Sequence, residues 1–168
     1  MQKILVPIDG SPNSLHAVRH VIAEYAENPG MEVHLLNVQP PFSRHITQFF
    51  SRKDIQAYHS DRGRDALRPI LALLDGAGVP HTAHVQVGHK AQVIAEAARR
   101  IGCDHIVMST ARKNSLTRMI EASVTNKVLE LTPVPVEVIA GDSVSKLERY
   151  GIPAALATAL GILAYAID

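Results

Sequence analysis

The sequence of 168 residues has one cysteine, no tryptophan and a formal net charge of only +1. The single Cys103 excludes an internal disulfide and is consistent with a reducing cytosol. No run of Lys or Arg stands out, so the sequence predicts no general attraction to nucleic acid or to an anionic membrane. Strand-like residues begin at position 3 and leave no room for a signal peptide, which makes the cytoplasm the expected location.

The sequence also shows no spacing of side chains that is typical of catalysis or of metal binding. No nucleophile is followed by a base at a spacing that suggests activation, and we therefore expect no enzymatic activity. The nine histidines are scattered along the chain. His16 and His20 lie one helical turn apart, but no third ligand is evident near them in the sequence. The prediction from the sequence is accordingly that the protein has no metal site.

What the sequence does contain is an alternation of strand and helix patterns typical of one α/β domain. The length and the apolar share of 46% suffice for a buried core. Short apolar runs predict strands over residues 4–8, 32–38, 81–87, 105–108 and 136–139. Helical periodicity predicts intervening helices over residues 12–27, 52–77, 89–101 and 116–131. This order favours a parallel, doubly wound sheet, and the domain is expected to span residues 1–142.

Two local signals refine the predicted helices. Ser11 precedes Pro12 and offers an N-cap with a proline in the first helical turn. Pro69 lies inside the long second helix and should kink or divide it, because proline lacks the N–H and its ring crowds the preceding turn.

The segment from Asp104 to Ile139 carries the clearest functional signal. A strand is followed by the polar loop 109–115, a helical piece and a further strand. A loop that leaves a buried strand and enters a helix is a common phosphate site, because N–H groups converge there and the helix dipole favours an anion. Small residues, usually glycine, let a phosphate approach the backbone. In this chain those positions hold Ser109, Arg112 and Ala122.

This segment and the opening residues 3–11 together resemble the universal stress protein family, over roughly residues 1–140. The family loop is Gly-x2-Gly-x9-Gly-[Ser/Thr]. The chain keeps its frame as Ser109-x2-Arg112-x9-Ala122-Ser123, with all three glycines replaced. The resemblance implies a Rossmann-like sheet of strand order 3-2-1-4-5 with helices on both faces, and a role in stress response.

The resemblance also implies where a nucleotide would bind. In open parallel sheets the ligand lies where the strand order reverses, here between the first and fourth strands, which we expect to end at Asp9 and Ser109. In the family, the residue matching Asp9 contacts the nucleoside and backbone near Val38 and Met108 frames the base. The hydroxyl matching Ser123 contacts a phosphate. The candidate nucleotide-binding residues are therefore Asp9, Val38, Met108, Ser109, Arg112, Ser123 and Val124.

The replaced glycines decide between two functional hypotheses. Side chains in the space of a phosphate remove hydrogen bonds and clash, so the leading hypothesis is a non-catalytic domain that binds no ATP. Asp9 would then organise the turn to Ser11, and Ser123 would cap a helix. In the alternative hypothesis ATP still binds, and the protein is a nucleotide switch. Asp9, Ser123 and a basic loop of Arg112 and Lys113 would then hold it, since a guanidinium can grip phosphate through two bonds.

An extension of residues 143–168 follows the predicted domain. Residues 151–167 carry no charge, and Leu156, Leu160 and Leu163 recur at helical spacing. We expect an apolar helix that packs on its own domain or on a partner subunit, because such a helix would not remain exposed to water. The alternative is a membrane-tethered regulatory domain, for which seventeen residues are short. The family that this chain resembles is generally dimeric, often through the last strand. The predicted homodimer interface therefore comprises Val136, Glu137, Val138, Ile139, Leu156, Leu160 and Leu163, and the dimer would act through contacts with an unidentified protein.

Overall fold

The computed structural model of the chain describes residues 2–112 and 124–143. Five parallel strands form one sheet of order β3-β2-β1-β4-β5, as the sequence and the family resemblance predicted. The strands are β1 (Gln2–Pro7), β2 (Met31–Gln39), β3 (His81–Val87), β4 (His105–Arg112) and β5 (Val136–Ser143).

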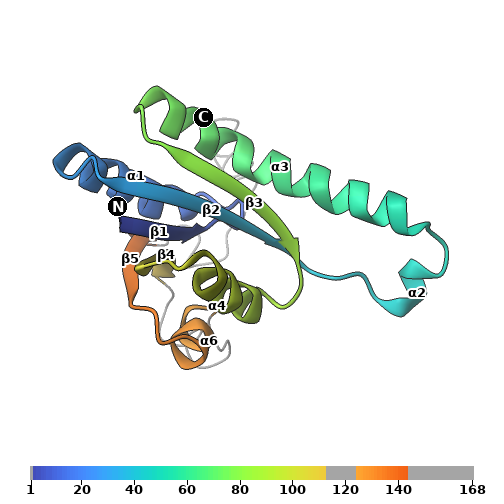
Figure 1. Cartoon of the computed structure of the whole chain (residues 1–168). Coiled ribbons are helices and arrows are strands. Elements are labelled where there is room, and N and C mark those ends of the chain that lie inside the picture. The colour runs from blue at the N-terminus through green and yellow to red at the C-terminus, as the bar shows by residue number, and fades with distance from the viewer. Residues whose placement is uncertain (1, 113–123, 144–168) are drawn as a thin grey trace, which may run out of the picture.

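Helices cover both faces of this sheet, which confirms the doubly wound architecture (Figure 1). Helices α1 (Ser14–Glu27) and α3 (Arg52–Gly76) pack on one face, and α4 (Lys90–Ile101) and α6 (Val124–Leu131) pack on the other. The short α2 (Arg44–Thr47) and the first turns of α3 project beyond the sheet.

Strand β1 shows why the sequence forms such a sheet. Ile4, Leu5 and Val6 are fully buried. Ile4 and Val6 belong to the cluster beneath α1 and α3, whereas Leu5 belongs to the cluster beneath α4 and α6. Since successive side chains of a strand point to opposite faces, a strand covered on both faces needs an unbroken apolar run.

The structure corrects the predicted N-cap of the first helix and the predicted division of the long helix. Helix α1 begins at Ser14 with Asn13 at the N-cap position, so Ser11 does not cap it. The N–H of Ser11 instead donates to the Asp9 carboxylate, which holds the connecting turn. Helix α3 is continuous from Arg52 to Gly76, and Pro69 does not divide it. Pro69 lies on the exposed side of α3, where water can solvate the carbonyl that lacks its helical partner.

Strand β4 differs more consequentially from the prediction. Ser109 was expected to end this strand, yet β4 continues through Arg112 and β5 continues through Ser143. Ser109 pairs with Ile139, Thr110 with Ala140 and Arg112 with Ser143, with an irregularity in register between Thr110 and Arg112. The first part of the predicted phosphate loop is therefore a paired strand.

Three sequence-based expectations fall outside these residues. The N-terminal part of the helix predicted over residues 116–131 is not described, and neither is the apolar stripe of Leu156, Leu160 and Leu163. The prediction of a separate extension after residue 142 therefore stays a prediction. Within the described ranges, no helix combines the length and the apolar character that crossing a bilayer requires.

Cys103 packs beside β4 as a small apolar side chain, and its environment predicts low reactivity. Burial raises the pKa of its thiol to about 11, with Asp104 and Glu32 adding to the effect and Lys3 opposing it. At pH 8 only about one thiol in a thousand would then be thiolate, the reactive form. We expect Ellman's reagent to leave the folded protein unlabelled and to titrate one thiol per chain in guanidinium chloride. Rapid labelling of the folded protein would contradict this.

Candidate functional site

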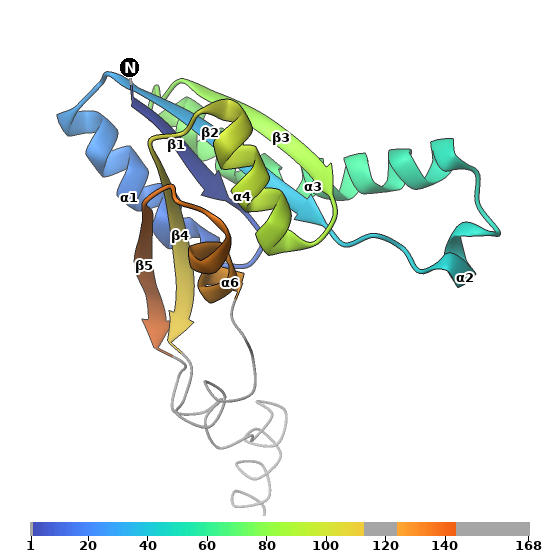
Figure 2. The ribbon, with the colours of Figure 1, turned by 60° about the horizontal axis from the view of Figure 1, so that its bottom comes forward.

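A crevice of about 600 Å³ lies at the carboxyl ends of β1, β2 and β4. Its position follows from the sheet itself. Strand β1 pairs with β2 from Gln2 to Pro7, but it pairs with β4 only at Ile4 and Leu5. Beyond these residues β1 and β4 diverge (Figure 2). The opening is thus at the reversal of strand order, where α/β sheets bind ligands.

The structure brings most of the predicted site residues together around this crevice. Asp9, Val38, Met108, Ser109 and Val124 all line it, although they come from four different segments of the chain. Arg112 lies on β4. Ser123 lies outside the described residues, as do Lys113 and Ala122, so this part of the predicted phosphate contact stays a prediction.

Asp9 is held firmly at the mouth of the crevice. Its Oδ1 accepts hydrogen bonds from the Ser14 hydroxyl at 2.6 Å and from the Ser11 N–H at 2.9 Å. Burial alone would raise the pKa of this carboxyl, but the hydrogen bonds from Ser14 and Ser11 and the charge of Lys90 outweigh it, so the pKa lies below its ordinary value. Asp9 is therefore a fixed negative charge at neutral pH and also organises the β1–α1 turn.

Hydrogen bonds join the ends of β1 and β2 next to the crevice, through a side chain that does not itself line it. The buried Asn37 donates from Nδ2 to the carbonyl of Ile8 at 2.8 Å and accepts from Gln39 at its Oδ1. The N–H of Ile8 donates to the carbonyl of Leu36 at 2.8 Å. These bonds keep the strand ends in place, so Asp9 and Val38 have a defined separation without any ligand.

Sequence reasoning missed several residues that also line the crevice, among them Asn13, Ser14, Lys90, Thr125 and Lys127. Lys90 starts the helix that follows β3, and Lys127 lies on α6. The signal that could have revealed Lys90 is topological, because every helix after a parallel strand begins at the same edge of the sheet. The two lysines add positive charge opposite Asp9, a feature that suits an anionic ligand.

Asn13 also explains the glycine at position 141. A Cβ on Gly141 would lie 2.5 Å from Oδ1 of Asn13 and 2.9 Å from the carbonyl oxygen of Thr110. Only glycine therefore lets β5 pass this close to β4 and to the start of α1. The close passage continues the β4–β5 pairing into the segment where a phosphate loop was predicted.

Taken together, the crevice has apolar walls and a few polar groups. Val38, Ile94 and Met108 provide apolar surface, while Asp9 and the two lysines provide charge. Such a mixture is typical of sites for small ligands with a flat apolar part and a polar or anionic part.

Comparisons with known proteins agree with this fold. The model of the universal stress protein family matches residues 1–140. The universal stress protein MJ0531 of Methanocaldococcus jannaschii is 29% identical over 140 residues, which cover 82% of this chain and 81% of that protein. The solved structure of hypothetical protein MJ0577 superposes with a TM-score of 0.70 at 25% identity, over 85% of this chain and 98% of the other.

Some solved structures of the same fold contain nucleotides. A universal stress protein family member from Arabidopsis thaliana, solved with AMP bound, has a TM-score of 0.60 at 17% identity, over 84% of this chain and 93% of that one. Two further neighbours were solved with cAMP and with dAMP. At these identities the likeness shows the shared fold.

Proposed function

The chain belongs to the universal stress protein family, and on that premise we propose a cytoplasmic stress-response domain that works as a homodimer through protein contacts, without binding ATP or catalysing a reaction. The observation that carries the proposal is the pairing of β4 with β5 through Arg112. This pairing involves the loop positions that would contact the phosphates of ATP.

Two of the three glycine positions of the family loop fall within this paired strand. Ser109 and Arg112 are in register with Ile139 and Ser143. In a parallel ladder every second residue of a strand bonds its N–H and C=O to a given neighbour, and the groups of an extended strand point alternately to either side instead of converging into a cradle for phosphate. Each lost bond worth about 1.4 kcal/mol lowers affinity tenfold. The loss of several such contacts would therefore make the affinity for ATP too weak for binding in a cell.

Calorimetric titration with ATP and Mg²⁺ tests the proposal. We expect no binding heat in the micromolar range for the wild-type chain. Micromolar affinity that Asp9→Ala abolishes, and that Asp61→Ala on the exposed surface of α3 leaves intact, would overturn it. A triple variant restoring the family glycines (Ser109→Gly, Arg112→Gly and Ala122→Gly) is expected to gain affinity for ATP, because it removes the side chains from the phosphate positions.

A second candidate function is a switch that responds to a nucleotide. It is favoured by Lys90 and Lys127 at the crevice, by the predicted basic loop of Arg112 and Lys113, and by neighbours that hold nucleoside monophosphates. A monophosphate needs fewer backbone contacts than ATP, while the nucleoside side of the crevice keeps Asp9 and Val38. Titration with AMP distinguishes the candidates, because AMP binding without ATP binding would favour the switch.

The position of β5 at the edge of the described sheet supports the proposed homodimer. An edge strand presents main-chain groups that pairing with a second copy would satisfy. Val138 on this strand is 42% exposed, so its apolar side chain is available for contact with a second copy. We infer that β5 joins the two subunits and that the stripe of Leu156, Leu160 and Leu163 adds apolar contact area.

A further inference from the structure

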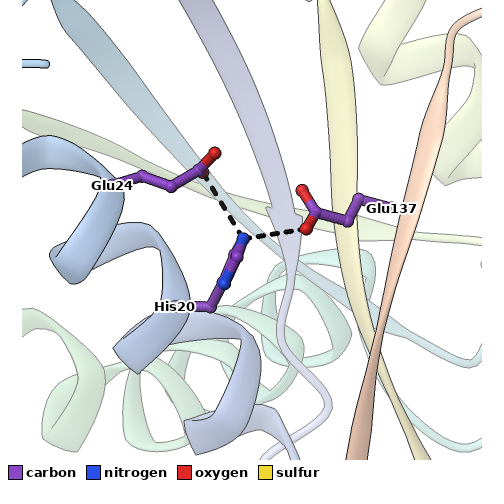
Figure 3. A group of neighbouring side chains, drawn as sticks. All are labelled: His20, Glu24 and Glu137. Carbon is purple, nitrogen blue, oxygen red and sulfur yellow. Dashed lines mark ion pairs between the residues drawn. The ribbon is translucent and has the colours of Figure 1, made fainter. Parts of the chain in front are cut away.

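Three side chains that could bind a metal ion converge between α1 and β5 (Figure 3). His20 and Glu24 lie one turn apart on α1, and Glu137 projects toward them from β5. The Nε2 atom of His20 is 2.9 Å from Oε1 of Glu137 and 3.7 Å from Oε2 of Glu24. All three potential ligand atoms lie within 4.8 Å of one another.

The surroundings of these atoms point to a missing partner. Nε2 of His20 and Oε2 of Glu24 are covered from solvent, although the side chains that carry them are partly exposed. Neither atom has a hydrogen-bond partner within the described part of the structure. The short contact between His20 and Glu137 is an ion pair in distance, but its geometry is not that of an aligned hydrogen bond. Polar atoms withdrawn from water in this way are costly unless something binds them.

We propose that His20, Glu24 and Glu137 form a binding site for a divalent cation of the zinc class. One imidazole nitrogen and two carboxylate oxygens are ligands that Zn²⁺ accepts, whereas Mg²⁺ and Ca²⁺ prefer oxygen alone. A neutral imidazole and two carboxylates also balance the charge of a dication. The site lies apart from the crevice, whose described lining includes none of these residues.

The distances suit this ion. Metal–ligand bonds of about 2.0–2.2 Å in a tetrahedral site place neighbouring ligand atoms roughly 3.3–3.6 Å apart. The two separations from Nε2 of His20, 2.9 Å and 3.7 Å, lie on either side of that range, and the two carboxylate oxygens lie within 4.8 Å of each other. Side-chain rotations would bring all three atoms into the range. Three protein ligands leave the fourth position for water. By linking α1 to the edge strand β5, the ion would stabilise the folded chain.

The experiment uses the full chain, freed of metal with a chelator and then titrated with Zn²⁺ against a chromophoric indicator. The variants are His20→Gln, Glu24→Gln and Glu137→Gln. The matched controls are His45→Gln and Glu96→Gln, which change exposed residues of the same types elsewhere on the surface. Thermal unfolding of every variant without metal shows that the fold is intact. If Glu137→Gln disturbs the sheet, Glu24→Gln, on the helix surface, still tests whether these side chains bind the ion.

We expect one Zn²⁺ per wild-type chain and an affinity at least about tenfold weaker in each ligand variant, since even loss of a partner beyond the direct ligands costs 10–100-fold. Both controls should bind like wild type, and Zn²⁺ should raise the unfolding temperature of wild type more than that of Glu24→Gln. Equal affinities across ligand variants and controls would overturn the proposal, because the zinc would then be held by scattered surface histidines. The absence of stoichiometric binding to wild type would overturn it as well.

Discussion

Gly63→Leu is expected to destabilise the fold by at least about 3 kcal/mol, the upper end of the cost of overpacking a core. Gly63 lies on the buried face of α3, where the helix crosses β3. A Cβ at this position would lie 2.4 Å and 2.6 Å from the two methyl carbons of Val85 and 3.1 Å from its Cβ. Valine is β-branched and has few rotamers, so it cannot swing aside. The helix or the strand would have to move.

Urea unfolding followed by circular dichroism measures this effect, and the chain supplies a matched control. Gly76 ends the same helix, and among the described residues nothing lies within 4 Å of the Cβ it would carry. Gly76→Ala should be neutral or slightly stabilising, because alanine is the better helix former. The double variant Gly63→Ala with Val85→Ala should be more stable than Gly63→Ala alone. If Gly63→Leu unfolds at the wild-type urea concentration, the close approach of α3 to β3 is wrong.

Gly63 also shows what a helical pattern in the sequence conceals. The stripe of Leu67, Ile70 and Leu74 is visible in the sequence and is buried in the structure. The same face continues through Gly63 and His59, which a search for apolar residues passes over. Gly63 is buried because Val85 of β3 lies against it. The ring of His59 lies 4.7 Å from that of Phe42. Such positions depend on the partner across the interface, which periodicity does not reveal.

The strands and the crevice were predictable because their signals in the sequence are local. An apolar run such as Ile4 to Val6 specifies a strand covered on both faces whatever its neighbours are, and the parallel order then places Asp9 and Ser109 at one edge. The length of β4 was not predictable in this way. It depends on the pairing with β5 and on the missing side chain of Gly141, which come later in the chain.

The same dependence on distant segments explains the residues that sequence reasoning missed. His20 was considered as a ligand together with His16, its neighbour on the helix. The third group of the cluster, Glu137, lies on β5 and approaches α1 only because β4 and β5 are adjacent in the sheet. Lys127 reaches the crevice from α6 through the packing of that helix on the sheet. Local spacing carries no information about such contacts.

Val138→Lys is expected to convert the proposed homodimer into a monomer. A lysine on an edge strand opposes strand pairing, and a twofold axis would bring the two introduced charges near each other. The cost to the subunit itself should be small, because Val138 is already 42% exposed. Sedimentation equilibrium of the full chain measures the change in mass, and circular dichroism shows that the variant is folded.

Val87→Lys is the matched control, because Val87 is 47% exposed on β3, the strand at the other edge of the sheet. It introduces the same charge on the same type of residue, so it should leave the dimer intact if β5 alone joins the subunits. Dissociation by both variants would point to an effect of charge instead of position. A wild-type chain that sediments as a monomer at high concentration would refute the dimer directly, and the exposed edge of β5 would then be open to a different protein.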